Sequence, residues 1–255
     1  MRMTIKRTVV VPDLQIPYHD EVAVKNVAAF IKKFRPDSVV ILGDELDLPQ
    51  VSRWEENKLG WFEQTLDRDR NLAIDILWDL TEHAKSAHVT RSNHTDRLYN
   101  VIMRKIPAFL ALPELRYDKF MRFEELGIEY HRQPYAIAKG WIAIHGDEGS
   151  LNPNAGLTAL AHARKMGFNV ICGHTHRAGQ SAFSEASNGV LRRVHRGIDA
   201  GHLMNIKRAH YVSSPNWQQA FQIMYEDAKG VQVDMIYIEK DGTFMVGGKR
   251  YGRAR

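Results

Sequence analysis

Residues 170–176 read VICGHTH, a short apolar run that ends at Gly173 and then places two histidines, His174 and His176, one residue apart. With 18 glycines and 12 histidines in 255 residues, chance predicts about 0.04 copies of Gly-His-x-His. Imidazole is the commonest metal ligand among side chains. An apolar run that stops at a turn glycine is typical of a buried strand. The stretch therefore predicts a strand over residues 169–172 with a metal-binding loop at its carboxyl end.

Four other apolar runs lead into metal-type ligands in the same way. They end at Asp13 and Gln15, at Asp44 and Asp47, at Asn93 and His94, and at His145. Loops at the carboxyl ends of strands in open α/β sheets converge on one crevice. Five such strand ends predict one polynuclear metal centre.

Taken singly, each motif has a plainer interpretation. Asp13 and Asp47 could cap loops, because short acidic side chains accept hydrogen bonds from nearby backbone N–H groups. Gly-Asp turns are common after strands. His145 could be an ordinary hydrogen-bonded histidine beside a turn glycine. The presence of all five motifs in one chain is what favours the metal centre.

The rest of the chain alternates strands with helices. Apolar residues at helical spacing predict helices over residues 21–34, 62–85, 96–105 and 157–166. Residues 190–251 are rich in strand signals, with a hairpin turn expected at Asp241-Gly242 between 233–238 and 243–246. Since no repeat or linker divides the chain, we expect one α/β (α+β) domain over 1–255. Residues 48–85 form a helical insertion, either a lid or a helix packed on the sheet.

Composition excludes several classes of protein. With 44% hydrophobic and 25% charged residues, the chain is too apolar to be mainly disordered. The single cysteine, Cys172, excludes an intrachain disulfide framework. The longest apolar stretch, residues 101–112, is interrupted by Arg104, Lys105 and Pro107, so no membrane span is expected. We expect a cytoplasmic protein whose net charge of +5 favours anionic partners.

The ordered motifs resemble those of the calcineurin-like metallophosphoesterase superfamily, which read Asp-x-His, Gly-Asp-x-x-Asp, Gly-Asn-His, His and Gly-His-x-His. The likeness runs from Asp13 to His176, about two thirds of the chain. It implies a sandwich of two β-sheets flanked by helices, with the strand-rich remainder completing the second sheet. The strings VPDLQIPYHD (11–20) and SPNWQQAF (214–221) also look similar to members of the superfamily encoded by bacteriophages.

The resemblance also implies a role for each motif residue. The first metal ion would be bound by Asp13, Gln15, Asp44 and His176, and the second by Asp44, Asn93, His145 and His174. These two divalent ions could be Mn, Fe, Ni or Zn, since mixed carboxylate, amide and imidazole ligands suit all of them. His94 would lie near the leaving-group oxygen, with Asp47 orienting it. Arg91, Arg97 and Arg177 flank the motifs and could bind phosphate oxygens.

Two departures from the superfamily pattern bear on the site. Gln15 replaces the usual histidine. Because an amide oxygen donates less strongly to a borderline metal than imidazole does, the first site would either bind more weakly or favour harder ions such as Mn. Ser92 replaces the usual glycine before Asn93, so the loop there would differ slightly, because serine tolerates tight backbone conformations less well than glycine.

The resemblance implies a dinuclear phosphodiesterase that hydrolyses small phosphodiesters or nucleotides by attack of a metal-bound hydroxide. The alternatives are a phosphomonoesterase or phosphoprotein phosphatase, a nuclease acting on nucleic acid, and a non-catalytic binding or scaffolding member of the fold. The sequence gives no indication of the oligomeric state.

Overall fold

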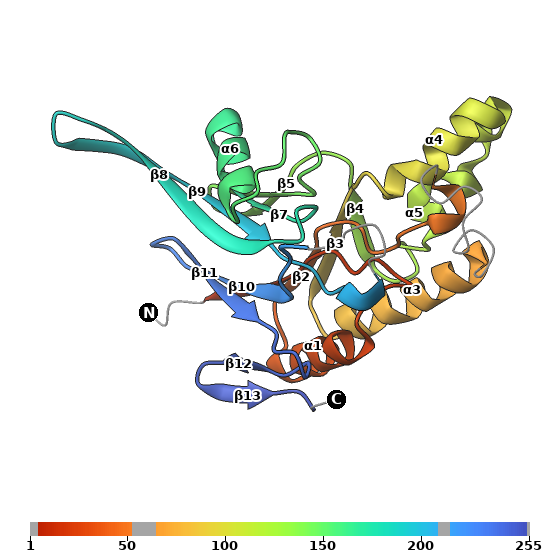
Figure 1. The fold of residues 1–255 in the computed structure, drawn as a ribbon, viewed down its shortest axis with the longest axis horizontal. Coiled ribbons are helices and arrows are strands. Elements are labelled where there is room, and N and C mark those ends of the chain that lie inside the picture. Colours follow the sequence, from red (N-terminus) through yellow and green to blue (C-terminus); the bar gives the residue numbers. More distant parts are fainter. Residues whose placement is uncertain (1–4, 53–64, 209–214, 254–255) are drawn as a thin grey trace.

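The computed structural model describes residues 5–52, 65–208 and 215–253, and its framework is a pair of β-sheets with helices on their outer faces (Figure 1). The first sheet has the strand order β11-β10-β1-β2-β3-β4. Neighbours from β1 to β4 are parallel, whereas β10 is antiparallel to both β1 and β11. These strands are β1 (Lys6–Val11), β2 (Ser38–Ile41), β3 (Ser86–Thr90), β4 (Ile128–His131), β10 (Ala220–Glu226) and β11 (Val231–Tyr237).

The second sheet has the order β5-β6-β7-β9-β8. Its inner strands β6, β7 and β9 are parallel, and its edge strands β5 and β8 are antiparallel to their neighbours. The β8–β9 hairpin extends well beyond the rest of the sheet (Figure 1). The strands are β5 (Tyr135–Ala138), β6 (Trp141–Ile144), β7 (Asn169–Cys172), β8 (Ala178–Ser187) and β9 (Val190–Ala200).

Three apolar layers hold the sandwich together. Val9 and Val39 pack with Phe30 and Leu77 between the first sheet and its helices. The alternate residues of the same strands pack with the second sheet, which gives the layer between the sheets. A third cluster joins the second sheet to a helix over residues 157–166. Because β1 and β2 are buried on both faces, their sequences are continuous apolar runs rather than alternating ones.

The helices begin and end where local chemistry permits. α1 (Glu21–Phe34) begins at Asp20, whose carboxylate accepts the N–H of Ala23 at 3.2 Å, and α6 (Leu157–Met166) ends at the left-handed Gly167. The Asp199 carboxylate on β9 accepts the N–H groups of Gly156 and Ala159, so the second sheet caps α6. The other helices are α3 (Leu66–Thr81), α4 (Thr95–Lys105) and α5 (Tyr117–Phe120), with short 3₁₀ turns at Pro49–Val51, Pro107–Ala111, Pro113–Leu115 and Ile206–Arg208.

The expected α/β sandwich is confirmed, and so are the helices at 21–34 and 157–166 and the strand at 169–172. In the predicted insertion, α3 packs Ala73, Leu77 and Leu80 into the core. The alternative prediction, that residues 48–85 form a lid, is not tested, because residues 53–64 lie outside the described residues.

The turn expected at Asp241-Gly242 is confirmed, but the flanking segments pair across it at one bridge only. The turn forms, because the Asp241 carboxylate accepts the N–H and O–H of Thr243. However, β11 pairs along its whole length with β10, and β12 (Phe244–Val246) pairs with β13 (Lys249–Tyr251), which leaves one bridge between Ile238 and Phe244. Phe244 does not continue the pairing with β11, because its ring packs against Phe30 of α1 and against Phe221.

The contact between β9 and α6 leaves no room for a side chain at Gly197. A Cβ there would lie 2.5 Å from the carbonyl carbon of Ala159 and from Cα of Leu160. Since these are backbone atoms, Gly197→Ala should lower the free energy of unfolding by about 2–3 kcal/mol. Gly230→Ala is the matched control, because a Cβ there has no heavy atom within 4 Å, and it should stay within about 0.5 kcal/mol of wild type. Urea denaturation measures both, and equal stability of the two variants would contradict this packing.

Candidate metal centre

The predicted ligands converge on Asp44, at the carboxyl ends of strands from both sheets. Asp13 follows β1, Asp44 follows β2, Asn93 follows β3, His145 follows β6, and His174 and His176 follow β7. Oδ2 of Asp44 lies 2.9 Å from Nε2 of Gln15 and 3.3 Å from Nε2 of His145. The Asp44 side chain is 1% exposed, so it is a carboxylate almost wholly removed from water.

Four of the predicted ligands have a left-handed backbone. Their φ angles are 54° for Gln15, 50° for Asp44, 62° for His174 and 56° for His176. This conformation is uncommon outside glycine, and a strained residue costs roughly 1–3 kcal/mol and persists where its surroundings over-determine it. Such residues cluster at functional sites. The backbone is therefore bent at the points where these side chains must turn inward.

Hydrogen bonds hold these bends in place. The N–H of Gln15 donates to the carbonyl of Asp44 at 2.8 Å, and the N–H of Asp44 donates to Oγ of Ser92 at 3.0 Å. The N–H of His174 donates to the Asp13 carboxylate at 3.0 Å. Ser92, the departure that was expected to change the loop, is fully buried and fastens the turn that carries Asp44.

The motif glycines allow the loops to approach closely. At Gly173 a Cβ would collide with Oδ1 of Asp13. Gly43 has φ +82°, and a Cβ there would lie 2.6 Å from Cβ of Ser92. Both positions therefore require glycine for steric reasons.

One half of the cluster contains Asp13, Gln15, Asp44 and His176. Oδ2 of Asp13 lies 3.1 Å from Nε2 of His176, and Nε2 of Gln15 lies 3.4 Å from the same nitrogen. Oε1 of Gln15 is buried without a hydrogen-bond partner. A 180° rotation of the Gln15 amide about its Cγ–Cδ bond would exchange Nε2 and Oε1. Oε1 would then face Asp44 and His176, as a metal ligand must. The residue types of this set suit a divalent cation, and Gln15 links the Asp13–His176 pair to Asp44.

The other half contains Asp44, Asn93, His145 and His174. One ligand atom each from Asp44, His145 and His174 lie within 4.8 Å of one another. Nε2 of His145 also lies 2.9 Å from Oδ1 of Asn93. Nδ1 of His145 lies 2.7 Å from the Leu42 carbonyl and donates to it, which leaves Nε2 facing the cluster. This set also fits a divalent cation.

The charges of the cluster favour a cation at its centre. Burial alone would lower the pKa of His145, but the Asp44 carboxylate raises it to about 10. Burial would raise the pKa of Asp44, but His145 and His94 hold it well below its usual value. Burial and the neighbouring His145 lower the pKa of His174. The Asp44–His145 pair therefore holds a proton at a position where the ligand set would place a metal ion.

His94, predicted to lie near the leaving group, stands at the start of α4 beside Asp44. Its Nε2 lies 3.7 Å from Oδ2 of Asp44, and its Nδ1 lies 3.1 Å from Oδ1 of Asp47. The structure thus brings His94 and Asp47 together. Nη2 of Arg97 lies 2.5 Å from Nε2 of His94, and Nη1 of Arg97 donates to the Asp47 carbonyl.

The other two predicted arginines are placed differently. Arg91 donates to both carboxylate oxygens of Asp147 at 2.7 Å and to Oδ2 of Asp96 at 2.7 and 2.9 Å. Its fork is therefore committed to two carboxylates of the protein. Arg177 donates through Nη1 to the Thr175 carbonyl at 3.4 Å, and its Nε is buried without a hydrogen-bond partner.

His202 belongs to the same region, although it lies outside the five sequence motifs. It is fully buried, and its ring centroid lies 5.5 Å from that of His176. Its Nδ1 accepts the N–H of Met204, whereas its Nε2 has no hydrogen-bond partner. The sequence does contain a signal for His202, because the pair Gly201-His202 follows β9 in the same way as Gly173-His174 follows β7. Trp217 is half-buried, and its ring lies edge-on to that of His176 with the centroids 4.5 Å apart.

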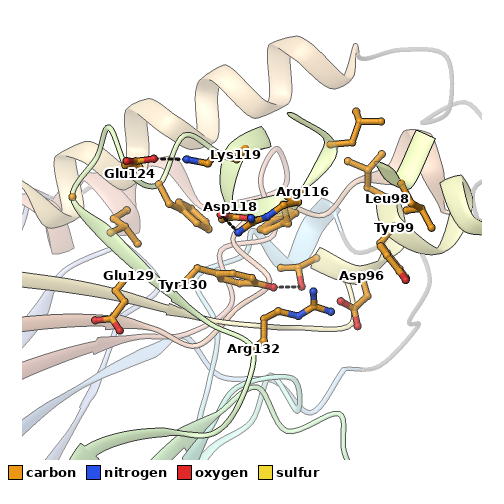
Figure 2. A pocket seen from close by; sticks show the side chains of 17 residues that line it. Asp96, Leu98, Tyr99, Arg116, Asp118, Lys119, Glu124, Glu129, Tyr130 and Arg132 are labelled. Carbon is orange, nitrogen blue, oxygen red and sulfur yellow. Dashed lines mark hydrogen bonds and ion pairs between the residues drawn. The ribbon is translucent and has the colours of Figure 1, made fainter. Parts of the chain in front are cut away.

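A cavity of about 650 Å³ lies between α4, α5 and β4 (Figure 2). Its wall includes Tyr117, whose hydroxyl donates to Oε1 of Glu45 at 2.6 Å. Burial raises the pKa of Glu45, the residue after Asp44, to about 7 despite that hydrogen bond. The hydroxyl of Tyr130, which Figure 2 labels, lies 3.4 Å from Oγ1 of Thr95, the first residue of α4. The cavity thus reaches the elements that carry Asp44 and His94.

Comparison with known proteins agrees with this architecture. The chain resembles the structure of vacuolar protein sorting 29 from Cryptosporidium parvum with a TM-score of 0.50 and 14% identity, over 98% of this chain and 99% of that one. The fold is therefore the one seen in that protein, a sandwich of two β-sheets flanked by helices. No protein-family model matches the chain.

Two relatives place the chain in a family. It is 30% identical to the Gene 54 protein of Mycobacterium phage D29 over 252 residues, which is 95% of this chain and 97% of that protein. It is also 30% identical to the Gene 54 protein of Mycobacterium phage L5 over 253 residues, 96% of this chain and 98% of that protein. The chain belongs to the family of these mycobacteriophage Gene 54 proteins.

Within the part of the chain that the structure describes, no helix combines the length and apolar character needed to cross a membrane.

Metal binding should release a proton. Because the pKa of His145 is raised to about 10, its ring is protonated at neutral pH, and a cation on Nε2 must displace that proton. Isothermal titration of Mn²⁺ into the metal-free protein in two buffers of different ionisation enthalpy should show release of about one proton. The apparent affinity should rise with pH until the pKa of His145 is passed. Identical heats in both buffers would contradict a protonated His145.

Proposed function

We propose that the protein is a dinuclear metal-dependent phosphoesterase that acts by preference on small phosphodiesters or nucleotides. The observation that carries the proposal is the position of Asp44. Its carboxylate stands between a set formed with Asp13, Gln15 and His176 and a set formed with Asn93, His145 and His174. A shared carboxylate between two such sets is the arrangement that holds a pair of divalent cations close together.

When bound, the two cations would supply Lewis acidity, which polarises the phosphate ester and activates a water molecule. The protein's own residues would do the rest. Water would attack phosphorus, the bond to the leaving oxygen would break, and His94 would give that oxygen a proton. Oδ1 of Asp47 lies 3.1 Å from Nδ1 of His94 without hydrogen-bond geometry, so a small rotation of the His94 ring would let Asp47 accept from Nδ1 and turn Nε2 towards the substrate.

Arg97 would take part as a substrate-binding residue. Its guanidinium now contacts Nε2 of His94 and the Asp47 carbonyl. For Nε2 to carry a proton, the guanidinium must move away, and a phosphate oxygen offers it a new acceptor. When the substrate binds, the Arg97 guanidinium would therefore move from Nε2 of His94 to a phosphate oxygen, which leaves Nε2 available to carry the proton.

The placement of the arginines favours a diester. Arg91 is committed to Asp96 and Asp147, so of the three predicted phosphate contacts Arg97 and Arg177 remain. A phosphodiester carries one negative charge, whereas a monoester carries nearly two at neutral pH. Fewer cationic side chains suit the diester. The oxygen-rich set of Asp13, Gln15 and Asp44 favours Mn²⁺ over softer cations at the first site.

Asp44→Asn tests the metal centre through activity. The amide keeps the shape of the side chain but removes its charge and the bridge between the two sets. The Mn²⁺-dependent rate on bis-p-nitrophenyl phosphate should fall by more than about 100-fold, beyond the effect of changing an outer-shell partner.

Asp79→Asn, the same change on the exposed face of α3, is the matched control and should keep the wild-type rate. In wild type, p-nitrophenyl phosphate should be hydrolysed more slowly than the diester. The reverse order would favour a phosphomonoesterase. No turnover of either ester by folded, Mn²⁺-loaded protein would favour a binding or scaffolding protein.

His94→Ala tests the proton donor. A dinucleotide has a poor leaving group that needs a proton, whereas p-nitrophenolate leaves without one. The variant should therefore lose about 10²–10⁴-fold in kcat on the dinucleotide and much less on bis-p-nitrophenyl phosphate. Asp47→Asn should give a smaller loss together with a shifted pH profile. Equal losses of His94→Ala on both substrates would contradict a role in leaving-group protonation.

A further inference from the structure

A second group of potential metal ligands lies away from Asp44, on the edge of the first sheet. It consists of His88 on β3 with Glu129 and His131 on β4, the edge strand. Register pairs His88 with Glu129 and Thr90 with His131, so these side chains emerge on the same face of the sheet. One ligand atom from each of the three residues lies within 4.8 Å of the others.

The distances suit a tetrahedral ion. Nδ1 of His88 lies 3.1 Å from Nε2 of His131. The Glu129 carboxylate lies 3.5 Å from Nδ1 of His88 and 3.9 Å from Nε2 of His131. Ligands about 2.0–2.1 Å from a tetrahedral Zn²⁺ stand about 3.3 Å apart. The three side chains are therefore close to the spacing that one such ion would impose.

Hydrogen bonding directs the free nitrogen of His88 towards the other two residues. Nε2 of His88 lies 3.2 Å from Oγ of Ser86. The Ser86 hydroxyl also lies 3.1 Å from Oγ of Ser38 and 3.5 Å from the Asp37 carbonyl, and when it donates to either of them it accepts from His88. Nδ1 of His88 then carries the lone pair. A ligating histidine whose other nitrogen donates in this way is typical of metal sites.

The rings are also fixed in orientation. Tyr135 on β5 stacks on both imidazoles, with ring centroids 4.5 Å from His88 and 4.2 Å from His131. Burial, and then the neighbouring His131, lower the pKa of His88, and burial lowers the pKa of His131. Both rings are thus neutral at pH 7, the form that binds metals. Figure 2 shows the Glu129 carboxylate turned away from the Tyr130 ring, outside the aromatic part of the cavity.

We propose that His88, Glu129 and His131 bind one divalent transition-metal ion, with Zn²⁺ as the best match, independently of the centre around Asp44. Two imidazoles and a carboxylate leave one coordination position for water. The ion would join the edge strand β4 to β3. It would also fix the turn at residues 132–134 that leads to Tyr135. This site stabilises the sheet edge whether or not the protein is a phosphoesterase.

The test compares two glutamates that each face a histidine. Glu129→Gln removes a ligand of the proposed site. Glu185→Gln is the matched control, because Oε1 of Glu185 lies 2.7 Å from Nε2 of His195 in a pair without a second histidine. Zn²⁺ bound at equilibrium is measured by competition with a chromogenic chelator. We expect Glu129→Gln to hold one equivalent less than wild type, and Glu185→Gln to match wild type.

His131→Ala should show the same loss and the same fall in the Zn²⁺-induced rise of Tm. Glu129 is 67% exposed in its side chain, so Glu129→Gln keeps the test valid even if His131→Ala does not fold. A crystal of the Zn²⁺-loaded protein should show an anomalous peak between β3 and β4. Equal stoichiometry in wild type and Glu129→Gln, an equal loss in both glutamate variants, or the absence of that peak would overturn the proposal.

Discussion

The structure depends on one buried carboxylate. Asp44 sits in a left-handed turn at the end of β2, with its N–H held by Ser92 and its side chain almost wholly out of water. A charge in that position is costly unless it is paired. The pairing explains why His145 comes from the second sheet, why Gln15 bends back towards the end of β2, and why the loops after β1 and β7 meet there. The sandwich brings the carboxyl ends of these strands together, and the loops that follow them meet at the Asp44 carboxylate.

The strained backbone at the site has the same origin. Gln15, Asp44, His174 and His176 all adopt positive φ, and the surrounding contacts hold them there. The contacts are of three kinds: hydrogen bonds from backbone to carboxylate, the close approach of Gly43 and Gly173, and the packed strands beneath. In the proposed function this backbone strain keeps the side chains of both ligand sets pre-organised before the substrate binds. The proposed zinc site on β3 and β4 differs, since its ligands lie on regular strands and need no such bends.

Much of this arrangement could be predicted from the sequence, because the signals were local. The apolar runs that end at Asp13 and Asp44 and the run over 169–172 predicted strands, and the ligand types that follow them predicted the site. The pairing of β11 could not be predicted, since the Asp241-Gly242 turn favours a hairpin locally while long-range packing of Phe244 decides otherwise. His88 and His131 come together because of strand register, which links residues 43 positions apart. His202 could have been predicted as part of the site, since the same Gly-His pair after a strand predicted the ligands at residues 173–176.

The proposed function requires two cations that share Asp44, and diffraction from Mn²⁺-loaded crystals tests this directly. Anomalous scattering locates the ions without reference to activity or substrate. The account predicts two peaks about 3.5–4 Å apart, one beside Asp13 and His176 and the other beside His145 and His174, with the Asp44 carboxylate between them. A single peak, or two peaks that do not share Asp44, would contradict it.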